Sequence, residues 1–221
     1  MGHIYRRLGL LDRARAAHRR AWEHISPNPA LLHAMLATTF MDEGNEEKLR
    51  EHIDQLTFDD GSPMRAGFAI RTNLWLGDME VAEALFDLHQ DFFEHYRPFT
   101  AAQIWIHRGE NERAEQALLA WEQRIGDQIP KAWGSDLEFR LFAIEALRGR
   151  TGKALDHLEA AVDKGFRDLL LATFGHPDIH PPSVREIAGH PRFHAAQDRI
   201  DADLARMRAE LAALDAEPRH P

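Results

Sequence analysis

The chain has 221 residues, 44% of them hydrophobic and 29% charged, proportions that are ordinary for a globular protein and exclude an intrinsically disordered one. Its formal net charge of -9 argues against nucleic-acid binding, for which a basic surface is expected. Because the sequence contains no cysteine, disulfides and thiolate metal sites are excluded as well.

The apolar runs are short. The longest, such as LLLATF at residues 169–174, cannot span a bilayer, and residues 1–20 lack the apolar core of a signal peptide. We therefore expect a cytoplasmic protein with no membrane partner.

A glycine-centred phrase recurs through the first three quarters of the chain. Intervals of 35, 33, 32 and 40 residues separate the glycines, which are Gly9, Gly44, Gly77, Gly109 and Gly149. A period close to 34 is typical of stacked helix-turn-helix units. Apolar residues at helical spacing precede each glycine, so we expect a first helix to end there with the glycine at positive φ. A second helix should follow, with a small residue five positions after the glycine in all units except the second, where Leu49 stands.

Helix starts are marked between the units. Asn28-Pro29 and Ser62-Pro63 each offer an N-cap followed by proline at the first helical position. Ser135 is followed by Glu138 at capping-box spacing, so a helix is expected to open at Ser135. No segment alternates as a strand would, and the fold class is predicted to be all-α.

The first unit resembles the tetratricopeptide repeat (TPR), with matching residues at Gly2, Tyr5, Gly9, Ala14, Ala21 and Pro27. The resemblance covers residues 1–165 as about five units and is weaker in the second, third and fifth. It implies a right-handed superhelix of stacked antiparallel helix pairs, with looser packing at Leu49. The motif's first helix would begin upstream of Met1, so the first hairpin is incomplete. We therefore expect a fragment, an alternative start, or an end that meets a partner.

Residues 166–221 are expected to form a capping region. The phrases GHPDIH (175–180) and GHPRFH (189–194) resemble the tail of many bacterial TPR proteins, whose repeats often follow a DNA-binding, cyclase or kinase domain. We interpret His176 and His190 as residues that begin short helices, with Ile179 and Phe193 as apolar anchors. The alternative is a metal site, because each phrase spaces two histidines by four residues. Pro181 and Pro182, however, should end any helix after His180.

The last helix is predicted over residues 191–216. Its apolar seam comprises Ile200, Leu204, Met207, Leu211 and Leu214. This seam is shorter than a coiled coil requires, so the helix is expected to cap the last repeat. A homodimer through this helix is the alternative.

No catalytic residue, metal ligand or cofactor site emerges from the sequence. There is no Gly-x-Ser-x-Gly elbow, and Gly149–Ala154 lacks both the first glycine and the final Ser or Thr of a phosphate loop. The acidic residues cluster in turns and at helix ends, where solvation and the helix dipole explain them.

The resemblance implies a concave groove that is lined by the first helices and holds a peptide. The residues expected to point into it are Arg6, Thr38, Met41, Arg71, Leu74, Gln103, Ile106, His107, Phe139 and Ala143. They lack the lysines and asparagines with which some relatives clamp a terminal carboxylate, so an apolar or amphipathic segment suits the groove better. Equally open is that these residues pack against the chain's own segments.

The function expected from these features is a non-enzymatic protein-protein interaction scaffold that binds a partner protein or peptide. Two alternatives remain: the regulatory C-terminal part of a larger signalling or transcription-control protein, and a metal-dependent enzyme that uses the histidine-rich tail.

Overall fold

The computed structural model describes residues 1–24, 29–54, 62–128, 134–168, 174 and 176–216. These residues contain thirteen α-helices, one 3-10 helix and no strand, which confirms the all-α prediction. The helices are α1 (Gly2–Arg7), α2 (Leu11–His24), α3 (Pro29–Glu43), α4 (Glu46–Asp54), α5 (Pro63–Leu76), α6 (Met79–Leu88), α7 (Gln90–Tyr96), α8 (Pro98–His107), α9 (Asn111–Gln128), α10 (Gly134–Leu147), α11 (Thr151–Asp163), η3 (Pro177–Ile179), α12 (Pro182–Ala188) and α13 (Pro191–Ala216). None of the described helices is both long and apolar enough to cross a bilayer.

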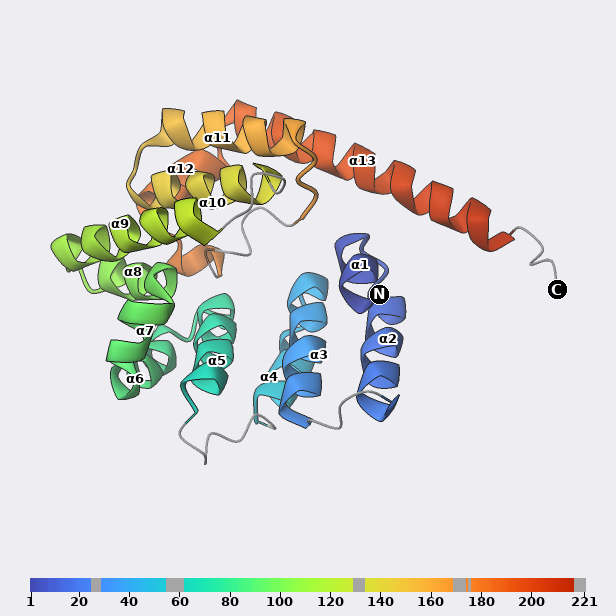
Figure 1. Cartoon of the computed structure of the whole chain (residues 1–221), viewed down its shortest axis with the longest axis horizontal. Coiled ribbons are helices and arrows are strands. Elements are labelled where there is room, and N and C mark those ends of the chain that lie inside the picture. The colour runs from blue at the N-terminus through green and yellow to red at the C-terminus, as the bar shows by residue number, and fades with distance from the viewer. Residues whose placement is uncertain (25–28, 55–61, 129–133, 169–173, 175, 217–221) are drawn as a thin grey trace.

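Five helix pairs follow one another along the chain: α1–α2, α3–α4, α5–α6, α8–α9 and α10–α11. Figure 1 shows them in an arc, with α13 running from the last pair back past the first. The expected helix starts agree at Pro29 and Pro63, whereas α10 begins at Gly134, one residue before Ser135. Pro27 and Asn28 lie outside the described residues.

The turn inside every pair has the same backbone geometry. All five predicted glycines have φ between 69° and 77°. In the fourth pair, the N–H of Gly109 donates to the carbonyl of Ile106 (3.1 Å) and that of Glu110 to the carbonyl of Trp105 (2.8 Å). This pair of backbone hydrogen bonds is the Schellman motif at the C-terminus of a helix, and it recurs at the other four glycines. The prediction of glycine C-caps is confirmed.

Close packing of the second helices follows from the small residues after the turns. Ala14, Ala82, Ala114 and Ala154 are all buried. Leu49, which replaces alanine in the second pair, is fully buried too, so the larger side chain is accommodated inside that pair.

The buried apolar residues form two clusters. The larger one extends from α5 to α13 and includes Phe86, which meets Trp105 edge-on at 5.0 Å between ring centroids. The smaller cluster is built by α3 and α4 with Leu76 at the end of α5. The N-terminal pairs therefore have less apolar support than the rest of the chain.

One helix was not expected. The second helix of the third unit ends at Leu88, and a separate helix, α7, begins at Gln90 after His89 adopts φ -137° and ψ 28°. Phe93 anchors α7 in the large core. The pattern is thus five pairs with one additional helix between the third and the fourth.

The two His-Pro phrases are helix entries. The Nδ1 atom of His176 accepts from the N–H of Asp178 (3.3 Å), and that of His190 accepts from the N–H of Arg192 (3.1 Å). Each ring thus satisfies one of the free donors in the first turn of a helix. The first phrase opens the short helix η3, as expected, whereas the second opens the long helix α13, predicted over 191–216, and not a short one. Pro182, expected only to end a helix, begins α12.

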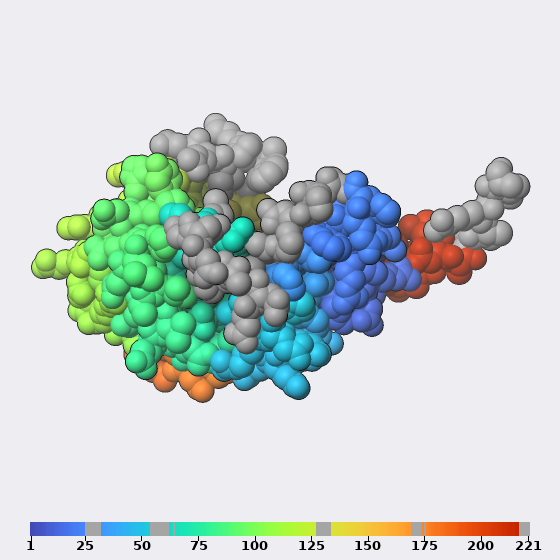
Figure 2. Space-filling view, turned by 90° about the horizontal axis from the view of Figure 1, so that it is seen from below, coloured from blue at the N-terminus to red at the C-terminus, as the bar shows by residue number. Residues whose placement is uncertain are grey.

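Helix α13 packs on α11 through its first half, where Phe193, Ala196 and Ile200 are buried. Its second half reaches the first pair, where Arg208 Nη1 donates to the carbonyl of Leu8 (3.1 Å) and Arg13 Nη1 pairs with Asp215 Oδ2 (2.5 Å). The end of α13 projects beyond α1 and α2 (Figure 2). The helix therefore covers the last pair, as expected, and also connects it to the first.

Candidate binding cavity

A cavity of about 670 Å³ lies among the first helices of all five pairs. We call it the central cavity. Its lining comprises His3, Arg6 and Arg7 of α1; Ala34, Met35, Thr38, Met41 and Asp42 of α3; Phe68, Arg71 and Leu74 of α5; Phe99, Thr100 and Gln103 of α8; Trp121 of α9; Asp136, Phe139, Arg140 and Ala143 of α10; and Phe166 and Asp168 after α11. Such a volume is typical of a ligand-binding site.

Eight of the ten residues that the sequence placed in a groove line the central cavity. They are Arg6, Thr38, Met41, Arg71, Leu74, Gln103, Phe139 and Ala143. Ile106 and His107 line a second pocket of about 290 Å³, together with Leu74, Gln103 and residues 178–182 of the chain itself.

Phe174 and residues 178–182 of the chain border that second pocket. The N–H of His176 donates to the carbonyl of Leu74 (2.8 Å) at the end of α5. Phe174 is buried between Phe99 and Phe142, with ring centroids at 6.4 and 5.9 Å. Ile106 and His107 therefore share a pocket with the chain's own residues 178–182, separate from the lining of the central cavity.

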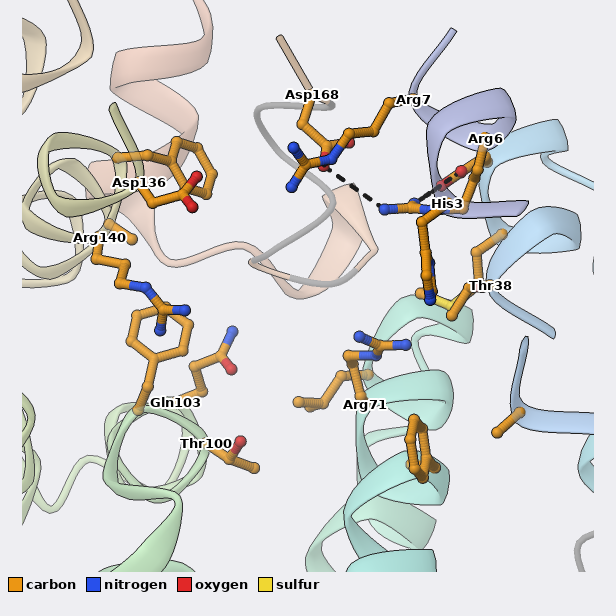
Figure 3. Close-up of a pocket in the computed structure, with 18 of the residues that line it drawn as sticks. His3, Arg6, Arg7, Thr38, Arg71, Thr100, Gln103, Asp136, Arg140 and Asp168 are labelled. Carbon is orange, nitrogen blue, oxygen red and sulfur yellow. Dashed lines mark hydrogen bonds and ion pairs between the residues drawn. The ribbon is translucent and has the colours of Figure 1, made fainter. Parts of the chain in front are cut away.

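Two of the cavity's arginines are neutralised by aspartates. Arg6 pairs with Asp42 at 2.8 Å and with Asp168 at 3.5 Å, and Arg7 reaches Asp168 at 3.4 Å (Figure 3). Burial raises the pKa of Asp42, although the charge of Arg6 opposes this. These ion pairs join α1 to the segment after α11 and border one side of the cavity.

Two further arginines have no ion pair with any residue that the structure describes. Arg71 on α5 and Arg140 on α10 stand on opposite walls of the central cavity (Figure 3). Burial, and then the like charge of Arg6, lowers the pKa of Arg71, and burial also lowers that of Arg140. Both side chains are nevertheless open to solvent, as is expected for groups that project into a hollow within the protein.

Aromatic rings form much of the remaining wall. The ring of Phe139 stacks on that of Phe166 at 4.1 Å between centroids. The guanidinium of Arg71 lies 5.8 Å from the ring centroid of Phe68, and that of Arg140 lies 5.2 Å from Trp121. The cavity thus offers apolar surface next to each of the two arginines.

The surroundings of the Thr38 hydroxyl and of the histidines bear on the alternative of a metal-dependent enzyme. The hydroxyl of Thr38 donates to the carbonyl of Met35 (2.7 Å) instead of a side-chain base. Throughout the described part of the chain, no three histidine, aspartate or glutamate side chains gather as metal ligands would. Of the histidines proposed as an alternative metal site, His180 is buried against Phe174 and His194 is exposed on α13.

Sequence reasoning missed Arg140, Asp42 and Asp168. Arg140 lies one helical turn after Asp136 on the face of α10 that also carries Phe139, so the helical spacing contained a signal. Asp168 lies beyond the last pair, and its approach to α1 has no local signal.

Comparisons with protein-family models, with curated proteins and with solved structures found no match to this chain.

Proposed function

We propose that the chain is a non-enzymatic interaction module that holds a segment of a partner protein in the central cavity. The observation that carries this proposal is the convergence of five consecutive first helices on one cavity, which mixes aromatic walls with two uncompensated arginines. Extended and helical peptides are bound by grooves of this composition, in which apolar surface supplies affinity and a few charges fix the register.

We further propose that the five pairs form a right-handed superhelix of the tetratricopeptide type and act in the cytoplasm. The repeated Schellman turn, the buried alanines after it and the spacing near 34 residues support this assignment.

The test is a selection of random dodecapeptides, displayed on phage, against the intact chain. Binders are then measured on Arg71→Glu and Phe139→Ala, which alter the charge and the apolar wall of the cavity. Arg20→Glu is the matched control, because Arg20 is an exposed arginine on α2 that does not line the cavity. Circular dichroism melts verify that each variant is folded.

We expect enriched peptides whose binding falls at least about tenfold in both cavity variants and is unchanged in the control. Peptides that bind equally well to all three variants would place the interaction elsewhere on the molecule and overturn the proposal. A selection that enriches no peptide would count against it as well.

A further inference from the structure

We propose that the segment bound in the central cavity is acidic, with one carboxylate beside Arg71, a second beside Arg140, and an apolar side chain between them. This inference rests on the proposed function and specifies the chemistry of its ligand.

Arg71 is the strongest reason for an anionic ligand. Arg6 and Arg97 are close enough to repel it. Asp42 attracts it but forms its ion pair with Arg6 at 2.8 Å, and no described residue forms an ion pair with Arg71. An arginine stays charged at any physiological pH, so its charge requires either water or an anion. Binding of an apolar segment would exclude that water and leave an unpaired buried cation, which is costly. A ligand that fills the cavity must therefore bring a negative group to Arg71.

Arg140, on the opposite wall of the cavity, likewise requires a negative group from a ligand that fills the cavity. Asp136 precedes it by one turn and attracts it, yet the two form no ion pair. Its guanidinium instead lies 5.2 Å from the ring centroid of Trp121, an arrangement that leaves its hydrogen-bond donors available in the plane of the group.

The arrangement favours two carboxylates over one phosphate. A phosphate group has a high local charge and is recognised by several donors that converge on one point. Here the two available arginines stand apart on α5 and α10 (Figure 3), and Arg6 and Arg7 are already held by Asp42 and Asp168. Two acidic side chains of one peptide, separated along its length, can each reach one of these two arginines.

The wall between the arginines determines what separates the two acids. Leu74 follows Arg71 on α5 and Phe139 precedes Arg140 on α10, both in the cavity wall, and Phe68 and Trp121 flank the guanidinium groups. An aliphatic or aromatic side chain would bury its surface on these residues. The preferred ligand therefore has an acidic residue, an apolar residue and a second acidic residue in that order. Because this protein has a net charge of -9, it offers acidic peptides little general attraction outside the cavity.

The test uses fluorescein-labelled decapeptides with acetylated and amidated ends, so that no terminal charge contributes. One pool carries two glutamates separated by one to four residues that include Phe or Leu. A second pool replaces both glutamates by glutamine, and a third replaces them by phosphoserine. Binding to the intact chain is followed by fluorescence polarisation.

We expect the glutamate pool to bind at least about tenfold more tightly than the glutamine pool, since each charge-assisted pair contributes to affinity. Arg71→Gln and Arg140→Gln should each reduce this preference by about threefold, and together they should abolish it. Arg71→Lys should retain part of it, and Arg20→Gln, on the exposed face of α2, should retain all of it.

Equal binding of the glutamate and glutamine pools would overturn the inference. If that binding is still lost in Phe139→Ala, the cavity holds peptides and the proposed function survives without the acidic preference. Tighter binding of phosphoserine than of glutamate would assign the site to a phosphopeptide instead. Failure of all three pools to bind contradicts the inference directly, whatever the phage selection yields.

Discussion

Among the described residues, six glycines have a left-handed backbone conformation. Five close the helix pairs and the sixth, Gly165 with φ 92°, ends α11. Only glycine enters this region without a steric penalty, which is why the sequence marks the turns so clearly.

Two histidines act as helix N-caps. His176 and His190 accept backbone N–H groups at helix starts, a role usually filled by serine or aspartate.

Gly109 and Gly126 allow the effect of backbone conformation on the free energy of unfolding to be measured without steric clashes of the new side chain. A Cβ at either position meets nothing within 4 Å, but Gly109 has φ +75° whereas Gly126 lies within α9. Gly109→Ala should cost about 1–2 kcal/mol of unfolding free energy, because alanine is strained in the left-handed region. Gly126→Ala should add about 0.5–1 kcal/mol, because alanine favours the helix. Urea unfolding checks both signs, and a stabilising Gly109→Ala would contradict the turn geometry.

Phe193 and His194 are neighbours with opposite roles at the start of α13. Phe193 is buried in the large core, whereas His194 is exposed. Phe193→Ala should reduce the unfolding free energy by about 3–5 kcal/mol, and His194→Ala should change it by less than about 0.5 kcal/mol. Equal effects in thermal or urea unfolding would show that Phe193 is not the anchor of the C-terminal region.

At the scale of elements, the α9–α10 contact is stabilised by a buried arginine. Arg148 is 5% exposed and pairs with Glu115 (2.9 Å), Glu122 (2.8 Å) and Glu145 (3.0 Å), of which Glu145 is itself buried. The α11–α13 contact has a surface counterpart, in which Arg192 bridges Asp156 and Glu159 at 2.7 Å with all three side chains partly exposed.

These two networks should differ in their contribution to stability. Arg148→Met should cost about 2 kcal/mol, less than a fully broken buried pair, because Glu115 and Glu122 can be solvated and the buried Glu145 keeps its pair with Arg150 at 3.3 Å. Arg192→Met should cost less than about 1 kcal/mol, because solvent already screens its partners. Chemical denaturation of the two variants provides the comparison, and a larger loss for Arg192→Met would reverse the assignment.

At the scale of the whole molecule, the C-terminal helix α13 contacts the first helix pair. Helix α13 contacts the first pair through Arg208 and Asp215, and Asp168 holds Arg6 and Arg7. These polar contacts reach from the C-terminal region, whose apolar cluster is large, to the N-terminal pairs, whose cluster is small. The N-terminal pairs should therefore respond first when conditions weaken the fold.

Acid is such a condition, because the histidines with shifted pKa values lie in α1 to α4. Burial lowers the pKa of His3, His18 and His52, with a further contribution to His52 from His33 at 2.8 Å. A histidine whose folded pKa lies below its unfolded value of about 6.5 binds its proton first in the unfolded chain. The corresponding stability is present at pH 7.5 and is lost as the pH falls below about 6.5.

Urea unfolding at pH 7.5, 6.5 and 5.5 should therefore show decreasing stability for the natural chain. The double variant His18→Gln/His52→Gln should show a weaker decrease over the same range, because neither glutamine takes up a proton. An identical pH dependence in the two proteins would exclude these histidines as its source.

Much of the fold could be predicted from local patterns. Pro63, the five glycines and the heptad-like seam of 191–216 gave helix boundaries close to those of α5, of the five turns and of α13. The break at His89 could not be predicted, because nothing in the sequence around it stops a helix as proline or glycine does. The sequence also could not predict which residues of the apolar seam of α13 are buried. Ile200, in the half of α13 that packs on α11, is buried, whereas Met207 and Leu214, further along the helix, are exposed.

The sequence by itself determined the all-α class and the repeated pairs, because helical periodicity and glycine caps act within a few residues of each other. The TPR resemblance added eight of the residues that line the cavity. Only the tertiary structure decided which arginines are neutralised. Asp42 and Asp168 reach Arg6 from far along the chain, while Arg71 and Arg140 have no such partner among the described residues. Ion pairing depends on distances between atoms of separate elements, and the packing of the helices alone sets those distances.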